Sequence, residues 1–205
     1  MKVLLTGFEP FGGEQVNPAW EAVRRLPDEL EGAQLVKREI CVEYDRAPQQ
    51  LRSAMQEEAP DIVICVGQAG GRAGITPEFV AINVMDAASA DNAGVLRSGE
   101  RLIPGAPDAY FSTLPVREMV SALREAEIPA ALSYTAGTYV CNCVMYHALN
   151  AAPQGTLAGF IHVPFSTAQA AARHALVPSL SLHTMVHALE ICVRTSVEAW
   201  RARQK

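Results

Sequence analysis

Three short, mainly apolar runs constrain the fold of this 205-residue chain more than any other feature. They span residues 2–6, 61–66 and 157–163, and glycine or proline directly follows each of them. Continuous apolar runs of this length are typical of strands buried on both faces, as in the parallel sheets of α/β proteins. Because functional groups gather where such strands end, we expect the functional site there.

Weaker strand patterns cover residues 35–40, 79–85 and 131–134, between segments with helical periodicity. One predicted helix begins just after Pro115, and the longest begins after Ser181, which can cap it. The apolar face of this last helix comprises Leu182, Met185, Val186, Leu189, Cys192, Val193, Val197 and Trp200. The alternation of strands and helices predicts an α/β protein. A long irregular stretch, residues 86–115, is expected to border the site.

Length and composition favour one catalytic domain over residues 1–205, with 49% hydrophobic and 19% charged residues. The net charge of −5 and the scattered lysines and arginines argue against nucleic-acid partners. The apolar run at the N-terminus breaks too early for a signal peptide, and no stretch approaches a membrane span. We therefore expect a cytoplasmic protein that enters no membrane and keeps its five cysteines reduced.

Cys141 lies in the segment 136–147, which follows a strand-like run and turns into a helical pattern. If a helix begins near Cys141, its unpaired N–H groups and positive dipole end lower the thiol pKa toward neutrality. The same N–H groups can receive a developing oxyanion. The alternative is that Cys141 and Cys143 are small buried hydrophobic residues, which is how we interpret Cys41, Cys65 and Cys192.

A histidine and a carboxylate also occupy places where they can assist a thiol. His162 lies in the run 157–163, close to the proline that ends it, where catalytic groups of α/β sheets commonly sit. Glu78 ends a glycine-rich turn, residues 67–78, and a carboxylate that accepts a hydrogen bond from imidazole fixes its tautomer and orientation. The alternatives are a core histidine and a surface carboxylate.

Five segments, residues 7–13, 67–83, 110–115, 135–142 and 159–164, carry family signatures in order along nearly the whole chain. They closely resemble the signatures of pyrrolidone-carboxylate peptidases, also called pyroglutamyl-peptidase I, which are cysteine peptidases. The resemblance implies a triad of Glu78, Cys141 and His162, because the family's Val-Cys-Asn pattern falls on Cys141 and not on Cys143. It also implies hydrolytic removal of an N-terminal pyroglutamyl residue from peptides through a thioester.

The same resemblance implies a fold and an assembly. The family's fold is a three-layer α/β/α sandwich of the phosphorylase/hydrolase-like kind, with a central twisted, mostly parallel sheet, which agrees with the elements predicted above. Its members are homo-oligomers, commonly tetramers. We therefore expect this chain to adopt that fold and to form a homo-oligomer.

The first family segment makes sense in terms of the substrate. A pyroglutamyl group is a cyclic lactam without an ammonium, so its site needs an apolar slot and partners for one ring N–H and one ring C=O. Phe8 and Phe11 can supply the slot, as the resemblance suggests, with Tyr139 and Val140 beside the nucleophile. The candidates for reading the lactam amide are Asn17 and Gln68. For the phenylalanines, the alternative is ordinary core packing.

Two positions depart from the family pattern and keep an alternative function open. Phe79 follows Glu78 where relatives usually carry a basic residue or serine, and Ala88 stands where an arginine is common. A catalytically impaired homologue that binds pyroglutamyl or other lactam groups is therefore the alternative. An α/β enzyme acting on nucleosides is a further reading by fold analogy alone, and it predicts phosphate dependence.

Other motifs predict neither a cofactor nor a metal. Gly7 and Gly12 imitate the spacing of a phosphate loop, but Gly13 and Glu14 stand where lysine and serine or threonine are required. His183 and His187, with Glu190 nearby, have the spacing of metal ligands on a helix. A third convincing ligand is missing from that stretch of sequence.

Overall fold

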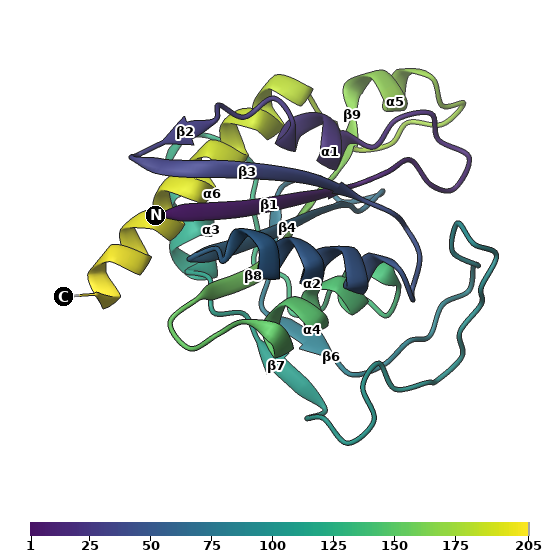
Figure 1. Cartoon of the computed structure of the whole chain (residues 1–205). Helices are drawn as coiled ribbons and strands as arrows, with labels where there is room; N and C mark the ends of the chain where they lie inside the picture. Colours follow the sequence, from purple (N-terminus) through teal and green to yellow (C-terminus); the bar gives the residue numbers. More distant parts are fainter. Residues whose placement is uncertain (205) are drawn as a thin grey trace.

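The computed structural model describes residues 1–204 and centres on a six-stranded sheet (Figure 1). Its strands are β1 (Lys2–Phe8), β2 (Glu29–Leu30), β3 (Ala33–Ile40), β4 (Ile62–Gln68), β5 (Thr76–Glu78) and β8 (Leu157–Val163). They lie in the order β2, β3, β1, β4, β8 and β5. The inner strands β3, β1, β4 and β8 are parallel, whereas β2 and β5 pair antiparallel at the two edges. The carboxyl ends of the parallel strands therefore meet at one end of the sheet.

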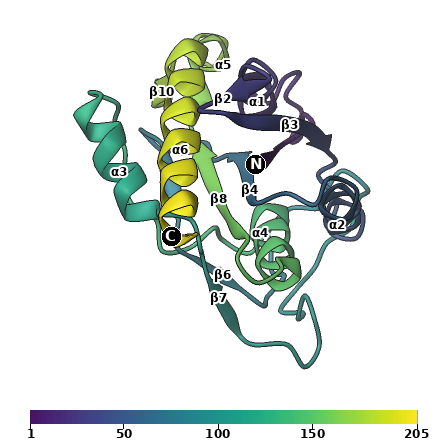
Figure 2. The ribbon, with the colours of Figure 1, turned by 60° about the vertical axis from the view of Figure 1, so that its left-hand side comes forward.

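Helices cover both faces of this sheet, which makes the fold a three-layer α/β/α sandwich (Figure 2). One face carries α1 (Pro18–Val23), α3 (Val116–Glu125) and α6 (Leu182–Arg203). The other carries α2 (Ala47–Glu58) and α4 (Val140–Ala151). A short helix, α5 (Thr167–Ala171), follows the central sheet. Within residues 1–204, none of the helices combines the length and apolar character that crossing a bilayer requires.

Two small sheets lie outside the central one. The first pairs β6 (Val80–Ile82) with β7 (Ala109–Phe111) in antiparallel fashion, and the second pairs β9 (Phe165–Ser166) with β10 (Ser179–Leu180) in parallel. Residues 83–108 connect β6 to β7 and form the long teal loop on the right of Figure 1. Each small sheet begins within two residues of a central strand, with β6 following β5 and β9 following β8.

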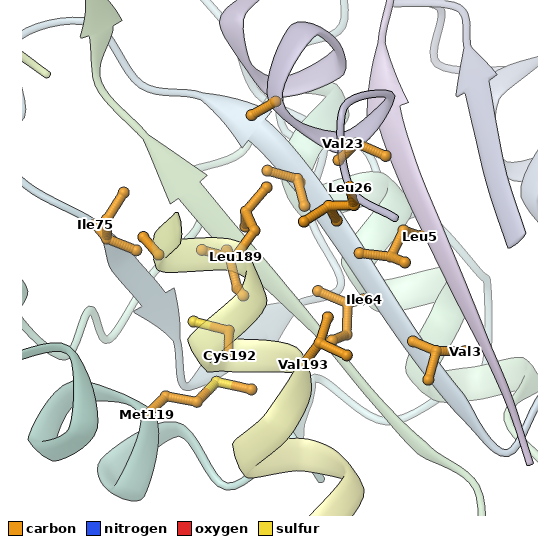
Figure 3. Close-up of a cluster of buried hydrophobic side chains, with 14 of the residues drawn as sticks. Val3, Leu5, Val23, Leu26, Ile64, Ile75, Met119, Leu189, Cys192 and Val193 are labelled. Atoms are coloured by element: carbon orange, nitrogen blue, oxygen red, sulfur yellow. The ribbon is translucent and has the colours of Figure 1, made fainter. Parts of the chain in front are cut away.

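The hydrophobic core has one part on each face of the sheet. Figure 3 shows the α6 side, where Leu189, Cys192 and Val193 pack toward Ile64 of β4 and Met119 of α3. The sequence prediction for α6 is confirmed, since its apolar face is buried or half-buried. The Ser181 side chain caps it by accepting a hydrogen bond from the Thr184 N–H at 3.0 Å.

Several strand predictions are confirmed, one is confirmed in part and one is wrong. The runs 2–6, 61–66 and 157–163 and the weaker run 35–40 coincide with β1, β4, β8 and β3. The predicted strand 79–85 is reduced to β6, which leaves the central sheet and pairs with β7.

Residues 131–134 form only an isolated bridge at Ser133 beside β5. Here the Ser133 N–H donates to the Pro77 carbonyl at 3.0 Å, but proline has no N–H with which to continue a parallel ladder. The proline on the neighbouring segment therefore accounts for the missing strand.

Buried leucine on α6 is expected to carry much of the stability of this layer. Leu189→Ala should lower the free energy of unfolding by about 2–5 kcal/mol, because it leaves a cavity in a packed core. Urea denaturation followed by circular dichroism measures this loss. Leu176→Ala is the matched control, since that side chain is fully exposed and should change stability by less than about 0.5 kcal/mol. Equal effects of the two substitutions would contradict the packing described here.

Candidate active site

A cavity of about 300 Å³ opens where the parallel strands of the central sheet end. Phe8 ends β1, Gln68 ends β4 and His162 lies one residue before the end of β8, and all three line the cavity. The other lining residues are Phe11, Asn17, Val42, Ala69, Arg72, Thr135, Ala136, Gly137, Tyr139, Val140 and Cys141. The structure thus brings the predicted nucleophile, base and substrate-binding residues to one cavity. Glu78 lies behind His162 and does not line it.

The pairing of β5 with β8 brings His162 and Glu78 together. In this antiparallel register Thr76 lies opposite His162 and Glu78 lies opposite Phe160, so His162 and Glu78 are diagonal neighbours on one face. His162 Nδ1 lies 2.7 Å from Glu78 Oε1. Because an ionised carboxylate only accepts, Nδ1 carries the proton, and Nε2 of the neutral ring is the acceptor. This is the orientation that a general base requires.

Arg72 completes this arrangement and was not singled out by the sequence. Its guanidinium lies 2.6 Å from Glu78 Oε1, and the same nitrogen donates to the Thr76 hydroxyl. Glu78 is fully buried, and a buried carboxylate is costly unless it is paired. The signal available in the sequence was an arginine in the same glycine-rich turn as Glu78.

Cys141 is the second residue of α4, so its backbone N–H belongs to the first turn of that helix. The N–H groups of a first turn have no carbonyl partners inside their own helix. Tyr139, at the N-cap position, turns its hydroxyl to the Ala90 carbonyl at 3.0 Å instead of capping α4. The first turn of α4 can therefore donate to an oxyanion formed at the thiol.

Close packing positions the thiol itself. A Cβ placed on Gly67 would lie 3.0 Å from Cys141 Sγ and 2.7 Å from a ring carbon of Phe160. Gly67 is the register partner of His162 in the β4–β8 pair, so the thiol lies against the strand next to the histidine. Any larger residue at position 67 would displace the thiol from this position.

Asn142 attaches the start of α4 to the strand that follows Glu78. Its Oδ1 accepts from the Ile82 N–H at 2.9 Å, and its Nδ2 donates to the carbonyls of Ile82 at 2.8 Å and Val84 at 3.1 Å. The side chain is fully buried. Asn142 thus holds the helix that carries Cys141 in a defined position relative to β6.

The protonation states of the thiol and imidazole differ from the sequence expectation. Burial, together with the nearby Glu78 carboxylate, raises the pKa of the Cys141 thiol to about 12, against an opposing effect of Arg72. Burial also lowers the pKa of His162, although its bond to Glu78 opposes this. The expectation of a thiol pKa near neutrality is therefore wrong, because desolvation outweighs the helix terminus. The resting site holds a neutral thiol and a neutral imidazole.

Aromatic side chains form much of the cavity wall. The Phe11 and Tyr139 ring centroids are 6.5 Å apart, and Tyr44 meets Tyr139 edge-on at 5.5 Å. Phe8 is almost fully buried and stacks at 6.2 Å on Phe160, so it serves the core as well as the cavity. Phe11 is only half-buried, and its placement fits the predicted slot better than the core-packing alternative.

The two candidates for reading a lactam amide are placed differently. Both ends of the Asn17 amide are engaged, because Oδ1 caps α1 through the Ala19 N–H and Nδ2 donates to the Glu9 carbonyl, each at 3.0 Å. Gln68 Oε1 accepts from Gln169 Nε2 at 3.0 Å. Gln68 Nε2 makes no hydrogen bond to any other described residue. Gln68 therefore has both of its amide N–H donors available to a ligand, whereas Asn17 has one.

The two departures from the family pattern lie outside the cavity wall. Phe79 packs on Phe111 and Tyr134, with centroid distances of 5.2 and 5.9 Å. Ala88 is exposed in the loop 83–108. The expectation that this loop borders the site is confirmed, since Asp86 N donates to the Thr138 carbonyl at 3.1 Å and Ala90 accepts from Tyr139.

The remaining candidate groups of the sequence lie apart from this cavity. Cys41, Cys65, Cys143 and Cys192 are buried, as the packing interpretation predicts. His187 Nδ1 lies 3.5 Å from Glu190 Oε2 on α6. Among residues 1–204, no group of three histidine, cysteine or acidic side chains is arranged to hold a metal ion.

A three-layer α/β/α sandwich with a thiol, an imidazole and a buried carboxylate at the carboxyl ends of its strands is the arrangement of a cysteine-type hydrolase. A model of the pyroglutamyl peptidase family matches residues 1–199. The chain belongs to this family of cysteine peptidases.

Individual relatives are similar over nearly the whole chain. The pyrrolidone-carboxylate peptidase of Thermococcus onnurineus is 55% identical over 202 residues, covering 97% of this chain and 100% of the relative. The Thermococcus kodakarensis protein of the same name is 51% identical and covers 97% of each chain. The crystal structure of Bacillus amyloliquefaciens pyroglutamyl peptidase I matches with a TM-score of 0.91 at 44% identity, covering 96% of this chain and 97% of the other. A mutant pyrrolidone carboxyl peptidase from Pyrococcus furiosus matches with a TM-score of 0.93 at 40% identity, covering 97% and 99%.

The geometry predicts how pH should affect a reaction that uses His162 as base. Only the neutral ring accepts a proton, so activity should fall as the pH drops through the pKa of His162, which burial places below its ordinary 6.5. The positive charge of Arg72 also lowers this pKa. Arg72→Met should therefore move the acid limb of the kcat/KM profile to higher pH. Arg72→Lys, which keeps the charge, should move it less. An acid limb unchanged in Arg72→Met would contradict this account.

Proposed function

We propose that this protein removes an N-terminal pyroglutamyl residue from peptides, with Cys141 as nucleophile, His162 as acid and base, and Glu78 as the group that orients His162. The main support for this proposal is the charge of the cavity wall. Among its described lining residues there is no carboxylate, and its one lysine or arginine, Arg72, is paired with Glu78. An ordinary N-terminal ammonium would lose its hydration there without a counter-charge, whereas an uncharged lactam would not.

The reaction starts from a neutral Cys141 thiol and a neutral His162 imidazole. Cys141 Sγ attacks the pyroglutamyl carbonyl carbon while its proton passes to His162 Nε2, and the first turn of α4 donates to the oxyanion. The imidazolium, stabilised by Glu78, returns that proton to the departing amine as the C–N bond breaks. A water molecule then gives a proton to His162 and attacks the thioester. Release of pyroglutamate returns the proton to the thiol.

Six of the lining residues have a part in holding the pyroglutamyl ring. Phe8, Phe11, Tyr139 and Val140 enclose the apolar ring, and Gln68 donates to its carbonyl. Asn17 supports the wall by capping α1, in line with its hydrogen bonds. No cofactor enters any of these steps.

The alternative readings have less support. The interpretation as a lactam-binding homologue without activity was based on the missing arginine at Ala88. That position is exposed and does not line the cavity. A nucleoside enzyme that depends on phosphate needs a cation to receive it, and the only cation of the described cavity wall already pairs with Glu78.

We also infer that residues 1–205 act as one catalytic domain, in the cytoplasm, as a homo-oligomer of four chains. The location is supported by cysteines that are all unpaired in the structure, and the assembly by the family resemblance. Sedimentation equilibrium of the purified protein tests the assembly. A single species with the mass of four chains is expected, and a monomer at micromolar concentration would contradict it.

Substitution of the nucleophile gives the most direct test of the reaction. Purified protein should release the amine from a pyroglutamyl amide, and Cys141→Ser should lower kcat by about a thousandfold or more. Cys143→Ser is the matched control, because Cys143 is buried two residues away on the same helix and donates to the Tyr44 carbonyl, which serine can also do. Equal turnover by the wild type and Cys141→Ser would remove Cys141 from its role.

A further inference from the structure

Two glutamines and a serine form a buried chain of hydrogen bonds that ends at the cavity. Ser166 caps α5, and Gln169 is the third residue of that helix. Gln169 Oε1 accepts from the Ser166 N–H at 3.0 Å and lies 3.2 Å from the Ser166 hydroxyl oxygen. Gln169 Nε2 lies 3.0 Å from Gln68 Oε1. Gln68, Ser166 and Gln169 are each at least nine-tenths buried, and of the three only Gln68 lines the cavity.

A backbone group determines the direction of every bond in this chain. The Ser166 N–H can only donate, so the Gln169 atom that faces it must be the amide oxygen. The Gln169 atom that faces Gln68 is then the NH₂ group, which can only donate. Gln68 must therefore turn its oxygen toward Gln169, and its own NH₂ group is left at the cavity.

The other neighbours of Gln169 Nε2 agree with this direction. The nitrogen lies 3.4 Å from the Val16 carbonyl oxygen and 3.2 Å from Glu14 Oε2, and both of these atoms are acceptors. Glu14 is itself held by an ion pair with Arg173. An oxygen in place of Nε2 would face these two fixed acceptors, so the contacts with Val16 and Glu14 exclude the reverse orientation of the Gln169 amide independently of the Ser166 N–H.

We propose that Gln169 is a positioning residue that sets the polarity of the Gln68 amide, and so makes the cavity prefer a ring that carries a carbonyl. This inference rests on the proposed function, since it assigns the Gln68 NH₂ group to the lactam C=O. A site built to donate a hydrogen bond discriminates against a ring that lacks the acceptor, because its own donor is then left unpaired. Gln169 acts on the substrate only through Gln68.

Gln169→Glu tests this polarity while keeping the cap of α5, because glutamate at the third helical position also accepts from the cap residue. Its second oxygen faces Gln68, whose amide must turn over to donate to it and then presents an oxygen to the cavity. The test compares kcat/KM for a pyroglutamyl amide and for the cyclopentanecarbonyl amide of the same amine, a ring of equal size without the lactam group. The preference for the lactam should fall about tenfold or more.

Further variants separate the orientation of the Gln68 amide from the effect of the added negative charge and from a loss of folding. Glu14→Gln/Gln169→Glu removes the repulsion between the two carboxylates and should keep the reduced preference. Recovery of the wild-type preference in this double variant would overturn the proposal. Gln154→Glu adds the same charge on an exposed loop outside the cavity and should keep the wild-type preference. If Gln169→Glu does not fold, Gln169→Met, which leaves Gln68 free to turn, should still show a reduced preference.

A binding measurement distinguishes failure of this inference from failure of the proposed function. 2-Pyrrolidone should protect Cys141 of the wild type from alkylation by iodoacetamide. The 2-pyrrolidone concentration that gives half-maximal protection should be at least about tenfold higher for Gln169→Glu. If the wild type cleaves no pyroglutamyl amide but shows this difference, the proposed function fails and the role of Gln169 stands. Equal protection of both proteins, no protection of the wild type, or an unchanged preference in Gln169→Glu would overturn the inference.

Discussion

The hydrogen bond between His162 and Glu78 is the interaction on which the rest of the site depends. It exists because β5 joins the edge of the sheet antiparallel to β8, which makes the two side chains diagonal neighbours on one face. Glu78 is fully buried there, and Arg72 supplies the positive partner that makes this burial tolerable. One carboxylate oxygen thus fixes the tautomer of the base and links the edge strand to the glycine-rich turn before it.

Burial has a second consequence, which concerns the thiol. The start of α4 and the guanidinium of Arg72 both favour a thiolate at Cys141, but desolvation and the nearby Glu78 carboxylate outweigh them and raise its pKa. The same low-polarity surroundings lower the pKa of His162. In the proposed reaction, the proton therefore passes from sulfur to imidazole as the thiol attacks the substrate. The buried surroundings that suit an uncharged lactam also keep the thiol and the imidazole neutral at rest.

The sequence predicted the central strands well because continuous apolar runs mark strands that are buried on both faces. Local patterns left the roles of Cys141, His162 and Glu78 open, and the family resemblance singled them out as a triad. The structure places Cys141 and His162 at one cavity, with Glu78 bonded to His162. Prediction from the sequence failed where a residue far away in the chain determines the local structure or the pKa. Pro77 interrupts pairing with residues 131–134, and the sign of the thiol pKa shift depends on tertiary burial. Gln169 lies 101 positions from Gln68 and makes its contact only in the folded chain.

We infer that Cys141 is acylated by the pyroglutamyl group with His162 as the base. Acid quenching of the enzyme during steady turnover of a pyroglutamyl ester, followed by mass spectrometry of proteolytic peptides, tests it directly. One pyroglutamyl group in thioester linkage is expected on Cys141 of the wild type, and far less in His162→Ala, because the buried thiol cannot be acylated without its base. Turnover without an adduct on Cys141, or an adduct on Cys143 instead, would contradict it.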